Sequence, residues 1–273
     1  MKPKKIIKLF DPVIDSKEQI SIKKVLNSHN WASGTGGNLV QKFETSFKNY
    51  VGATNCIAVN NGTAALHLAL SMLDIKNKEV ILPSLSFVST AHAVLYNGGI
   101  PKFAEINSDT LCIDPNSVEN LITKKTRVIL PVHFAGLSCD LDSLNMLSEK
   151  YGVHIIEDAA HAAGTSFNNK KIGSHSNMVC FSFHPAKNIG TPGGGMIAIN
   201  SKSISKYNEL KSKRWCGISN RKNHSYDVNH LGWNFYMNEF SAAIGIEQLK
   251  KLENHNLKRK KAAKRYFEEI YLE

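Results

Sequence analysis

Short, continuous apolar runs that alternate with helix-like segments are the feature that most constrains the fold of this chain. The expected strands are Cys56–Asn60, Glu79–Leu82, Arg127–His133, Val153–Glu157, Met178–Phe183 and Met196–Ile199. The expected helices among them are Ala64–Leu73, Ser89–Tyr96, Asp142–Lys150 and Ser203–Lys213. Strands that helices cover on both faces are near-continuous apolar runs, and most residues of these runs are apolar. The pattern predicts an α/β fold with a mostly parallel central sheet flanked by helices.

The two ends of the chain have a different pattern. Two helices are expected near the N-terminus, Ser16–Ser28 and Leu39–Tyr50, with a glycine-rich loop at Ala32–Gly37 between them. The last segment, Asn238–Leu272, is long, charged and helical in pattern. It is expected to bend or break near Asn254–Asn256.

The composition is that of a globular protein with its own core. The 273 residues are 42% hydrophobic, enough for a sizeable core, and no apolar run is long enough to span a bilayer. The basic N-terminus lacks a signal-peptide core, so a cytoplasmic location is the default. The five cysteines form no CxxC pair, and neither disulfides nor a metal site is expected.

The formal net charge is +11, and much of it lies in the last segment. A nucleic-acid patch is one interpretation, but no recognition motif or interleaved aromatic set accompanies the charges. A solvated helix face is the favoured interpretation. A positive field would also favour an anionic substrate such as a nucleotide sugar.

Two residues at the ends of predicted strands could carry chemistry. Lys187 closes the stretch FSFHPAK, just before three glycines, and Asp158 follows the run Val153–Glu157. Ligands of parallel sheets bind at the carboxyl ends of strands, where these side chains could meet. An amine for the aldehyde and a carboxylate for the ring nitrogen are the minimum needed to hold pyridoxal phosphate. The plainer interpretations are a solvated lysine and a helix-capping aspartate.

Four other positions could complete such a site. The segment Gly62–Ala64 opens a helix after a strand, which suits a phosphate, although a simple helix cap has the same pattern. Ser182 could also bind the phosphate. Phe87 could stack on a flat cofactor or fill the core. His161 could reach the phenolic oxygen of the ring or fill a loop.

Together these motifs closely resemble the DegT/DnrJ/EryC1/StrS family of pyridoxal-phosphate-dependent sugar aminotransferases. The resemblance runs from about Pro12 to the end of the chain. It implies the aspartate-aminotransferase-like fold (fold type I). The stretches that carry it are Asn61–Leu66, Pro83–Phe87, Glu157–His161, Phe181–Lys187 and Leu231–Phe240.

The resemblance implies a role for each residue that would contact the cofactor ring. Lys187 is expected to be the Schiff-base lysine, and Asp158 the partner of the pyridine nitrogen. His161 stands where the family has glutamine or histidine near the phenolic oxygen. Phe87 corresponds to the stacking aromatic.

The resemblance also implies how the phosphate is held. Thr63, the backbone of Gly62 and Ala64, and Ser182 are the expected phosphate ligands. Asn234 matches an asparagine that reaches the phosphate from the neighbouring subunit. A homodimer with a shared active site is therefore expected.

Two departures from the family pattern stand out. Tyr236 lies where the family often has arginine, and family members usually continue beyond the equivalent of Glu273 into a small C-terminal domain. That domain is expected to be largely missing here. The expected division is 1–35 as an N-terminal segment contributing to the small domain and the active-site rim, 36–237 as the large cofactor-binding domain, and 238–273 as a long helix leading to a truncated C-terminal domain.

The activity implied is transfer of an amino group from glutamate or glutamine to a keto group of a nucleotide-linked sugar, feeding polysaccharide synthesis. No nucleic-acid or membrane partner is expected. A dehydratase-like reaction is one alternative, but the sugar dehydratases of the family carry histidine in place of Lys187. The others are a lysine-bearing member that makes an aromatic amino acid and a truncated, non-catalytic or regulatory homologue.

Overall fold

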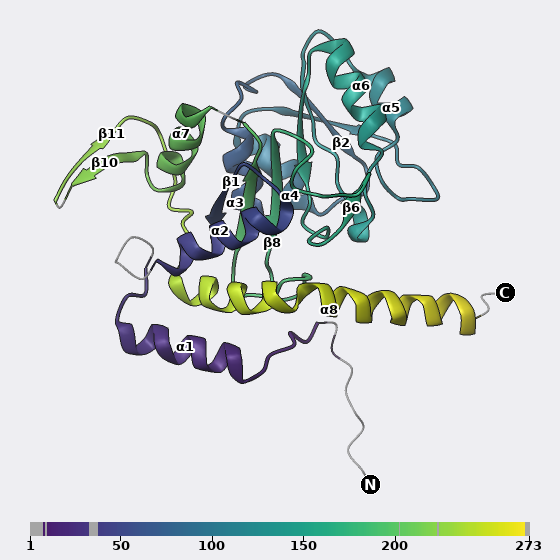
Figure 1. The fold of residues 1–273 in the computed structure, drawn as a ribbon. Helices are drawn as coiled ribbons and strands as arrows, with labels where there is room; N and C mark the ends of the chain where they lie inside the picture. The colour runs from purple at the N-terminus through teal and green to yellow at the C-terminus, as the bar shows by residue number, and fades with distance from the viewer. Residues whose placement is uncertain (1–7, 9, 33–37, 202, 223, 271–273) are drawn as a thin grey trace.

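A seven-stranded sheet forms the centre of the protein in the computed structural model, which describes residues 8, 10–32, 38–201, 203–222 and 224–270 (Figure 1). The strand order is β1-β9-β8-β5-β4-β2-β3. Strand β9 is antiparallel to both of its neighbours, and all other adjacent pairs are parallel. The strands are β1 (Asn55–Val59), β2 (Glu79–Pro83), β3 (Ile100–Ala104), β4 (Thr126–Ile129), β5 (His154–Asp158), β8 (Met178–Ser182) and β9 (Gly195–Ile199).

Helices cover both faces of the sheet and create two apolar cores. One face carries α3 (Gly62–Leu70), α4 (Val88–Tyr96) and α7 (Ile204–Arg214). The other carries α2 (Leu39–Val51), α5 (Pro115–Leu121), α6 (Leu141–Tyr151) and the first half of α8 (Glu239–Glu269). Successive strand residues point to opposite faces, so Ile57 packs in one core while Cys56 and Ala58 pack in the other. The mostly parallel α/β architecture expected from the sequence is confirmed.

Two long helices meet beside this sheet. The buried positions of α2 recur every three to four residues, and its Phe47 contacts Phe181 of β8 at a centroid separation of 4.9 Å. Helix α8 crosses next to it, and a Cβ at Gly245 would lie 2.7 Å from the Phe43 ring. The glycine therefore allows α8 to approach α2 closely.

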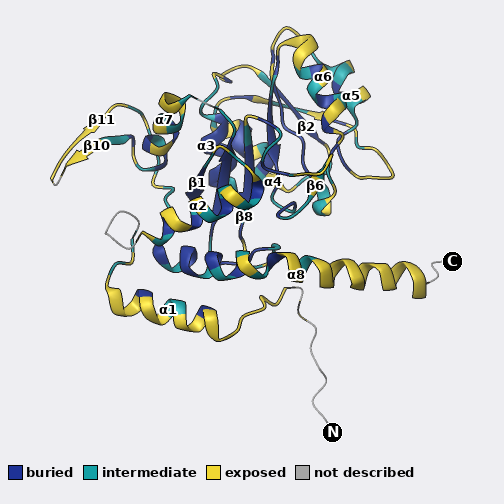
Figure 2. Cartoon of the chain, viewed as in Figure 1, coloured by how far each residue is buried: buried dark blue, intermediate teal, exposed yellow. Residues whose placement is uncertain are grey.

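Helix α1 (Ser16–Ser28) lies against α8 through polar contacts (Figure 1). Gln248 of α8 donates to Glu18 at 2.7 Å and to the Val13 carbonyl at 2.8 Å. Lys251 pairs with Glu18 at 2.5 Å. The second half of α8, by contrast, is exposed (Figure 2).

Four strands outside the central sheet and a short 3-10 helix complete the described structure. The strands form two hairpins, β6 (Ser166–Phe167) with β7 (Lys170–Lys171) and β10 (Ile218–Lys222) with β11 (Ser225–Val228). The 3-10 helix η1 is Phe134–Gly136. None of the helices in the described ranges is long and apolar enough to cross a membrane.

The predicted strands and helices are found with small shifts at their ends, and two predictions are wrong. Strand β4 ends at Ile129 rather than His133, since Pro131 has no N–H for the ladder. Helix α8 runs unbroken through Asn254–Asn256, because asparagine and histidine disfavour a helix only slightly and neither glycine nor proline follows Gly245 in the helix. In the predicted loop Ala32–Gly37, residues 33–37 lie outside the described ranges.

Strand β3 and helix α5 were not predicted from the sequence. Strand β3 is an edge strand, half exposed, with Pro101 in its middle, so it has no continuous apolar run. Helix α5 has 7 residues and buries only Val118. Neither element reaches the site described below.

Candidate active site

Five segments at the carboxyl ends of strands enclose a cavity of about 290 Å³. They are the turn from β1 into α3, the segments that follow β2 and β4, the end of β5, and the segment that follows β8. The predicted site residues that line the cavity are Gly62, Thr63, Phe87, Asp158, His161, Ser182 and Lys187. The structure thus brings seven of the nine predicted positions together. Ala64 and Asn234 do not line it.

Asp158 is the last residue of β5, and its carboxylate is buried at the floor of the cavity. The Thr90 hydroxyl donates to Oδ2 at 2.9 Å, and the Ala160 N–H donates to Oδ1 at 3.1 Å. Burial raises the pKa of Asp158, and these two hydrogen bonds offset part of that rise. A cationic partner in the cavity would therefore be strongly favoured.

Glu157 precedes Asp158 and points to the opposite face of the sheet, as consecutive strand residues must. Its Oε2 lies 2.8 Å from Nε2 of His133, and both side chains have no exposed surface. Nδ1 of His133 accepts the Cys139 N–H at 3.1 Å, so the imidazole proton is on Nε2 and is donated to Glu157. Burial pushes the pKa of Glu157 up, but the hydrogen bonds from His133 and Ser176 together with the nearby histidines outweigh it, and the pKa is lowered. The pair ties β5 to the segment after β4.

Lys187 lies in the turn after β8, half-buried, with its backbone N–H bound to the His184 carbonyl at 2.8 Å. Burial lowers the pKa of its amine, and the nearby Asp158 charge opposes this effect. A larger fraction of the Lys187 amine is therefore neutral at neutral pH. That is the form that attacks an aldehyde.

The N-terminus of α3 forms a cradle on the opposite wall. The first N–H groups of a helix have no intrahelical acceptor, which leaves those of Gly62 and Thr63 available. A Cβ at Gly62 would lie 2.7 Å from Cβ of Ser182, so only glycine allows the helix to start against β8. The Ala64 N–H is already bound by the Asn61 side chain at 2.8 Å. Ala64 therefore helps to cap the helix.

Phe87 and His161 occupy the remaining walls. The Phe87 ring is 72% exposed although it lines the cavity, which leaves a free aromatic face. Nδ1 of His161 accepts the Ala135 N–H at 3.3 Å, so its Nε2 carries the proton in the neutral ring. Burial and the Lys187 charge lower the pKa of His161. The neutral ring is a donor through Nε2.

Asn234 is exposed and lies outside the cavity of its own chain. Its backbone carbonyl accepts the Asn60 side chain at 3.4 Å, and its backbone pairs with Trp215. Its predicted role, to reach a phosphate in the neighbouring subunit, concerns a second chain and stays a prediction.

Two residues at the cavity were not predicted as site residues from the sequence. Ser86 lines the cavity, and Thr90 lies behind it, with its hydroxyl on Asp158. The only sequence signal was spacing: Thr90 follows Phe87 by three residues, on the inner side of the first turn of α4. Such spacing shows a face of the helix but not which side chain lies across from it.

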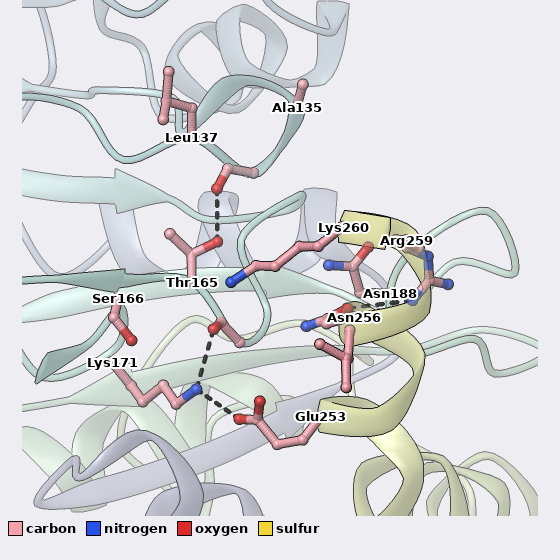
Figure 3. A pocket seen from close by; sticks show the side chains of 13 residues that line it. Ala135, Leu137, Thr165, Ser166, Lys171, Asn188, Glu253, Asn256, Arg259 and Lys260 are labelled. Atoms are coloured by element: carbon pink, nitrogen blue, oxygen red, sulfur yellow. Dashed lines mark hydrogen bonds and ion pairs between the residues drawn. The ribbon is translucent and has the colours of Figure 1, made fainter. Parts of the chain in front are cut away.

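A second cavity, of about 540 Å³, lies between α8 and the turns that follow β4, β5 and β8 (Figure 3). It lies near the first cavity, because Ala135 and Asn188 line the second while their chain neighbours Phe134 and Lys187 line the first. The charged residues that line it are Lys171, Glu253, Arg259 and Lys260.

Most of the polar groups on the floor of this second cavity already have partners. Lys171 binds the Gly164 carbonyl at 3.1 Å and Glu253 at 2.6 Å. Lys260 extends its amine into the cavity, and it has no hydrogen bond or ion pair with any residue that the structure describes (Figure 3). The cavity therefore offers an unpaired cation.

Comparison with known proteins now identifies the fold and its family. Residues 12–271 match the model of the DegT/DnrJ/EryC1/StrS aminotransferase family. The chain belongs to this family. The DegT/DnrJ/EryC1/StrS resemblance seen in the sequence, and the fold type I architecture it implied, are confirmed.

Individual proteins are similar to this one over nearly the whole chain. The spore coat polysaccharide biosynthesis protein SpsC of Bacillus subtilis is 36% identical, over 93% of this chain and 67% of SpsC. Helicobacter pylori PseC, an aminotransferase involved in pseudoaminic acid biosynthesis, is 30% identical with a TM-score of 0.85, over 91% of this chain and 66% of PseC.

A third similar structure is 3-amino-5-hydroxybenzoic acid synthase, 32% identical with a TM-score of 0.85, over 90% of this chain and 64% of the synthase. The chain thus spans about two thirds of the length of these three proteins.

Proposed function

We propose that this protein holds pyridoxal phosphate in the first cavity and transfers amino groups. The observation that carries the proposal is that the Lys187 amine and the Asp158 carboxylate line one cavity, opposite the helix start at Gly62 and Thr63. The residues fit the cofactor: an amine for its aldehyde, a buried carboxylate for its ring nitrogen, and free N–H groups for its phosphate. Membership of the family supports the same cofactor.

Bound pyridoxal phosphate supplies an aldehyde that captures amines and a protonated ring that withdraws electrons from the neighbouring carbon. The residues of the cavity supply the rest. Asp158 holds the proton on the ring nitrogen, since a buried carboxylate stabilises an adjacent cation. Phe87 offers the free aromatic face for stacking, and Nε2–H of His161 donates to the phenolic oxygen. The neutral Lys187 amine moves the proton at the α-carbon of the amino donor.

The acceptor that we propose is a keto group of a nucleotide-linked sugar, and the donor is glutamate or glutamine. The relation to SpsC and PseC supports a product that enters polysaccharide or glycan synthesis. The second cavity supports an anionic acceptor, because Lys260 makes no hydrogen bond or ion pair there with any described residue and two residues that line this cavity are chain neighbours of residues that line the first. A diphosphate is the group of a nucleotide sugar that such a cation would bind.

One observation favours a second candidate within the same chemistry. The likeness to 3-amino-5-hydroxybenzoic acid synthase supports amination of a ring ketone that leads to an aromatic amino acid. Such an acceptor carries no diphosphate, so the second cavity would have no role in its binding. The dehydratase-like alternative is disfavoured because Lys187 is present.

We further propose that two copies share their active sites through Asn234, which is exposed as such a role requires. The division of the chain at residues 35 and 237 and the cytoplasmic location stay predictions from the sequence.

The test begins with the cofactor. Purified protein is mixed with pyridoxal phosphate, reduced with borohydride and analysed by mass spectrometry. One reduced cofactor attached at Lys187 is expected, and none in Lys187→Ala. Attachment in that variant at wild-type level would refute the site. Turnover is then measured with glutamate or glutamine and nucleotide-linked keto sugars, with a carbocyclic ketone as the competing substrate.

A further inference from the structure

The carboxylate of Asp158 is held from behind by a chain of two hydroxyl groups. Thr90 is fully buried in the first turn of α4, and its Oγ1 lies 2.9 Å from Oδ2 of Asp158. The Ser86 hydroxyl lies 2.6 Å from that same Oγ1. Ser86 lines the cavity and Thr90 does not. The Thr90 hydroxyl therefore contacts Asp158 from the side away from the ligand.

The number of protons on each group decides which hydroxyl group donates in each of these two hydrogen bonds. An ionised carboxylate can only accept, so Thr90 must donate its single proton to Asp158. Ser86 must then donate to Thr90. If Asp158 were protonated toward Thr90, Thr90 would be released to donate to Ser86, and the Ser86 proton could turn to the Phe87 carbonyl at 3.3 Å. The direction of donation between Ser86, Thr90 and Asp158 thus depends on the charge of Asp158.

Helix formation does not explain the Thr90 hydroxyl. Threonine within a helix often bonds to the carbonyl four residues earlier. Here the hydroxyl contacts the Ser86 side chain and Asp158 instead. The Thr90 N–H already binds the Phe87 carbonyl at 3.0 Å, so the helix start is satisfied without the hydroxyl.

We propose that Thr90, supported by Ser86, is a positioning residue that fixes the orientation of the Asp158 carboxylate and keeps it ionised toward the cavity. With Ala160 on Oδ1 and Thr90 on Oδ2, the lone pairs that remain are those available to a ligand. The inference rests on the proposed function only for the identity of that ligand, the protonated ring nitrogen of pyridoxal phosphate.

Other charges also act on Asp158, and the experiment must separate them from Thr90. The ionisable groups near it are Glu157, His133, His161, Cys180 and Lys187. None of them changes in Thr90→Val, which keeps the shape of the side chain and removes only the hydroxyl. Thr90→Ser keeps the hydroxyl and is the matched control.

The first measurement needs no cofactor chemistry. The protein labelled with ¹³C at aspartate carboxyl groups is titrated by NMR, and Asp158→Asn identifies the signal. Losing a hydrogen bond to a charged group should raise the titration midpoint of Asp158 by about one pH unit in Thr90→Val, about tenfold in the proton-binding constant. Thr90→Ser should stay near wild type. An unchanged midpoint in folded Thr90→Val would overturn the proposal.

Two further measurements keep the outcome decisive. If Thr90→Val does not fold, Ser86→Ala, at a half-buried position, should raise the same midpoint by a smaller amount, and no rise refutes the proposal. In protein loaded with pyridoxal phosphate labelled with ¹⁵N in the ring, the ring nitrogen should lose its proton at lower pH in Thr90→Val than in wild type. If wild-type protein fails to bind the cofactor, the proposed function is refuted, but the carboxyl titration still tests the role of Thr90.

Discussion

Glu157 and Asp158 are consecutive buried carboxylates of β5 whose pKa values move in opposite directions. Contact with His133 holds the pKa of Glu157 below its ordinary value, against the effect of burial. Burial raises the pKa of Asp158, against two hydrogen bonds. The alternation of a β-strand causes the difference, since it turns one side chain to a buried imidazole and the other to the cavity. Glu157 therefore serves the fold, and Asp158 is left to serve a ligand.

Glu157→Gln should destabilise the protein. The change replaces the charged acceptor of the fully buried His133 hydrogen bond by a neutral amide, and a hydrogen bond to a charged group is worth about 1.5–3 kcal/mol. Urea unfolding measures the loss. Glu119→Gln, which breaks an exposed pair with Lys150, is the control and should leave the unfolding midpoint nearly unchanged. Equal effects of the two variants would contradict the assignment.

The same pair predicts a pH dependence. The folded-state pKa of Glu157 is depressed below the ordinary 4.5, so its contribution to the free energy of unfolding is present above pH 4.5 and is lost as pH falls through the folded-state value. The stability gap between wild type and Glu157→Gln should therefore shrink in acid. A stability gap that widens as pH falls below 4.5 would show that the pKa of Glu157 is not lowered in the folded state.

Lys187 should capture pyridoxal phosphate at lower pH than an ordinary lysine does. Burial lowers the pKa of its amine from 10.5, and Asp158 opposes this effect. The rate of capture, followed by absorbance, should rise with pH to a midpoint below 10.5. In Asp158→Asn the midpoint should fall further while turnover drops by roughly 100-fold or more. A midpoint that rises in Asp158→Asn would contradict the geometry.

Gly62→Ala should weaken cofactor binding. The new Cβ would lie 2.7 Å from Cβ of Ser182 and would push the start of α3 away from β8. We expect a loss of at least tenfold in affinity for pyridoxal phosphate, measured by equilibrium titration, which is about 1.4 kcal/mol. Gly193→Ala is the matched control, because a Cβ there would meet only the Asn60 carbonyl at 3.4 Å. Equal losses in both variants would show that the close approach is not the cause.

Lys260→Gln should raise KM for a nucleotide-linked sugar and leave kcat nearly unchanged. Its unpaired amine extends into the second cavity, so its loss should weaken ground-state binding of a diphosphate about 3- to 10-fold. Lys264→Gln is the control, since Lys264 lies outside that cavity and pairs with Glu268 at 3.4 Å. Equal KM values in Lys260→Gln and wild type would remove the second cavity from substrate binding.

Sequence reasoning succeeded wherever a signal was local. The run before Asp158 and the stretch that ends at Lys187 each placed a reactive group at the end of a strand, and both groups line the cavity. It failed where the pattern was weak or the partner distant. The edge strand β3 carries a proline and half-exposed residues, and the break expected in α8 ignored how little asparagine costs a helix.

The order of apolar runs and helix starts by itself determined the α/β class, because strand and helix periods depend on neighbouring residues, and the sequence motifs indicated the family. Only the tertiary structure decided which side chains face one another. It set Thr90 of α4 against Asp158 of β5, 68 positions apart, and His133 against Glu157, 24 apart. Such contacts depend on how elements pack, and packing brings together residues that share no local pattern.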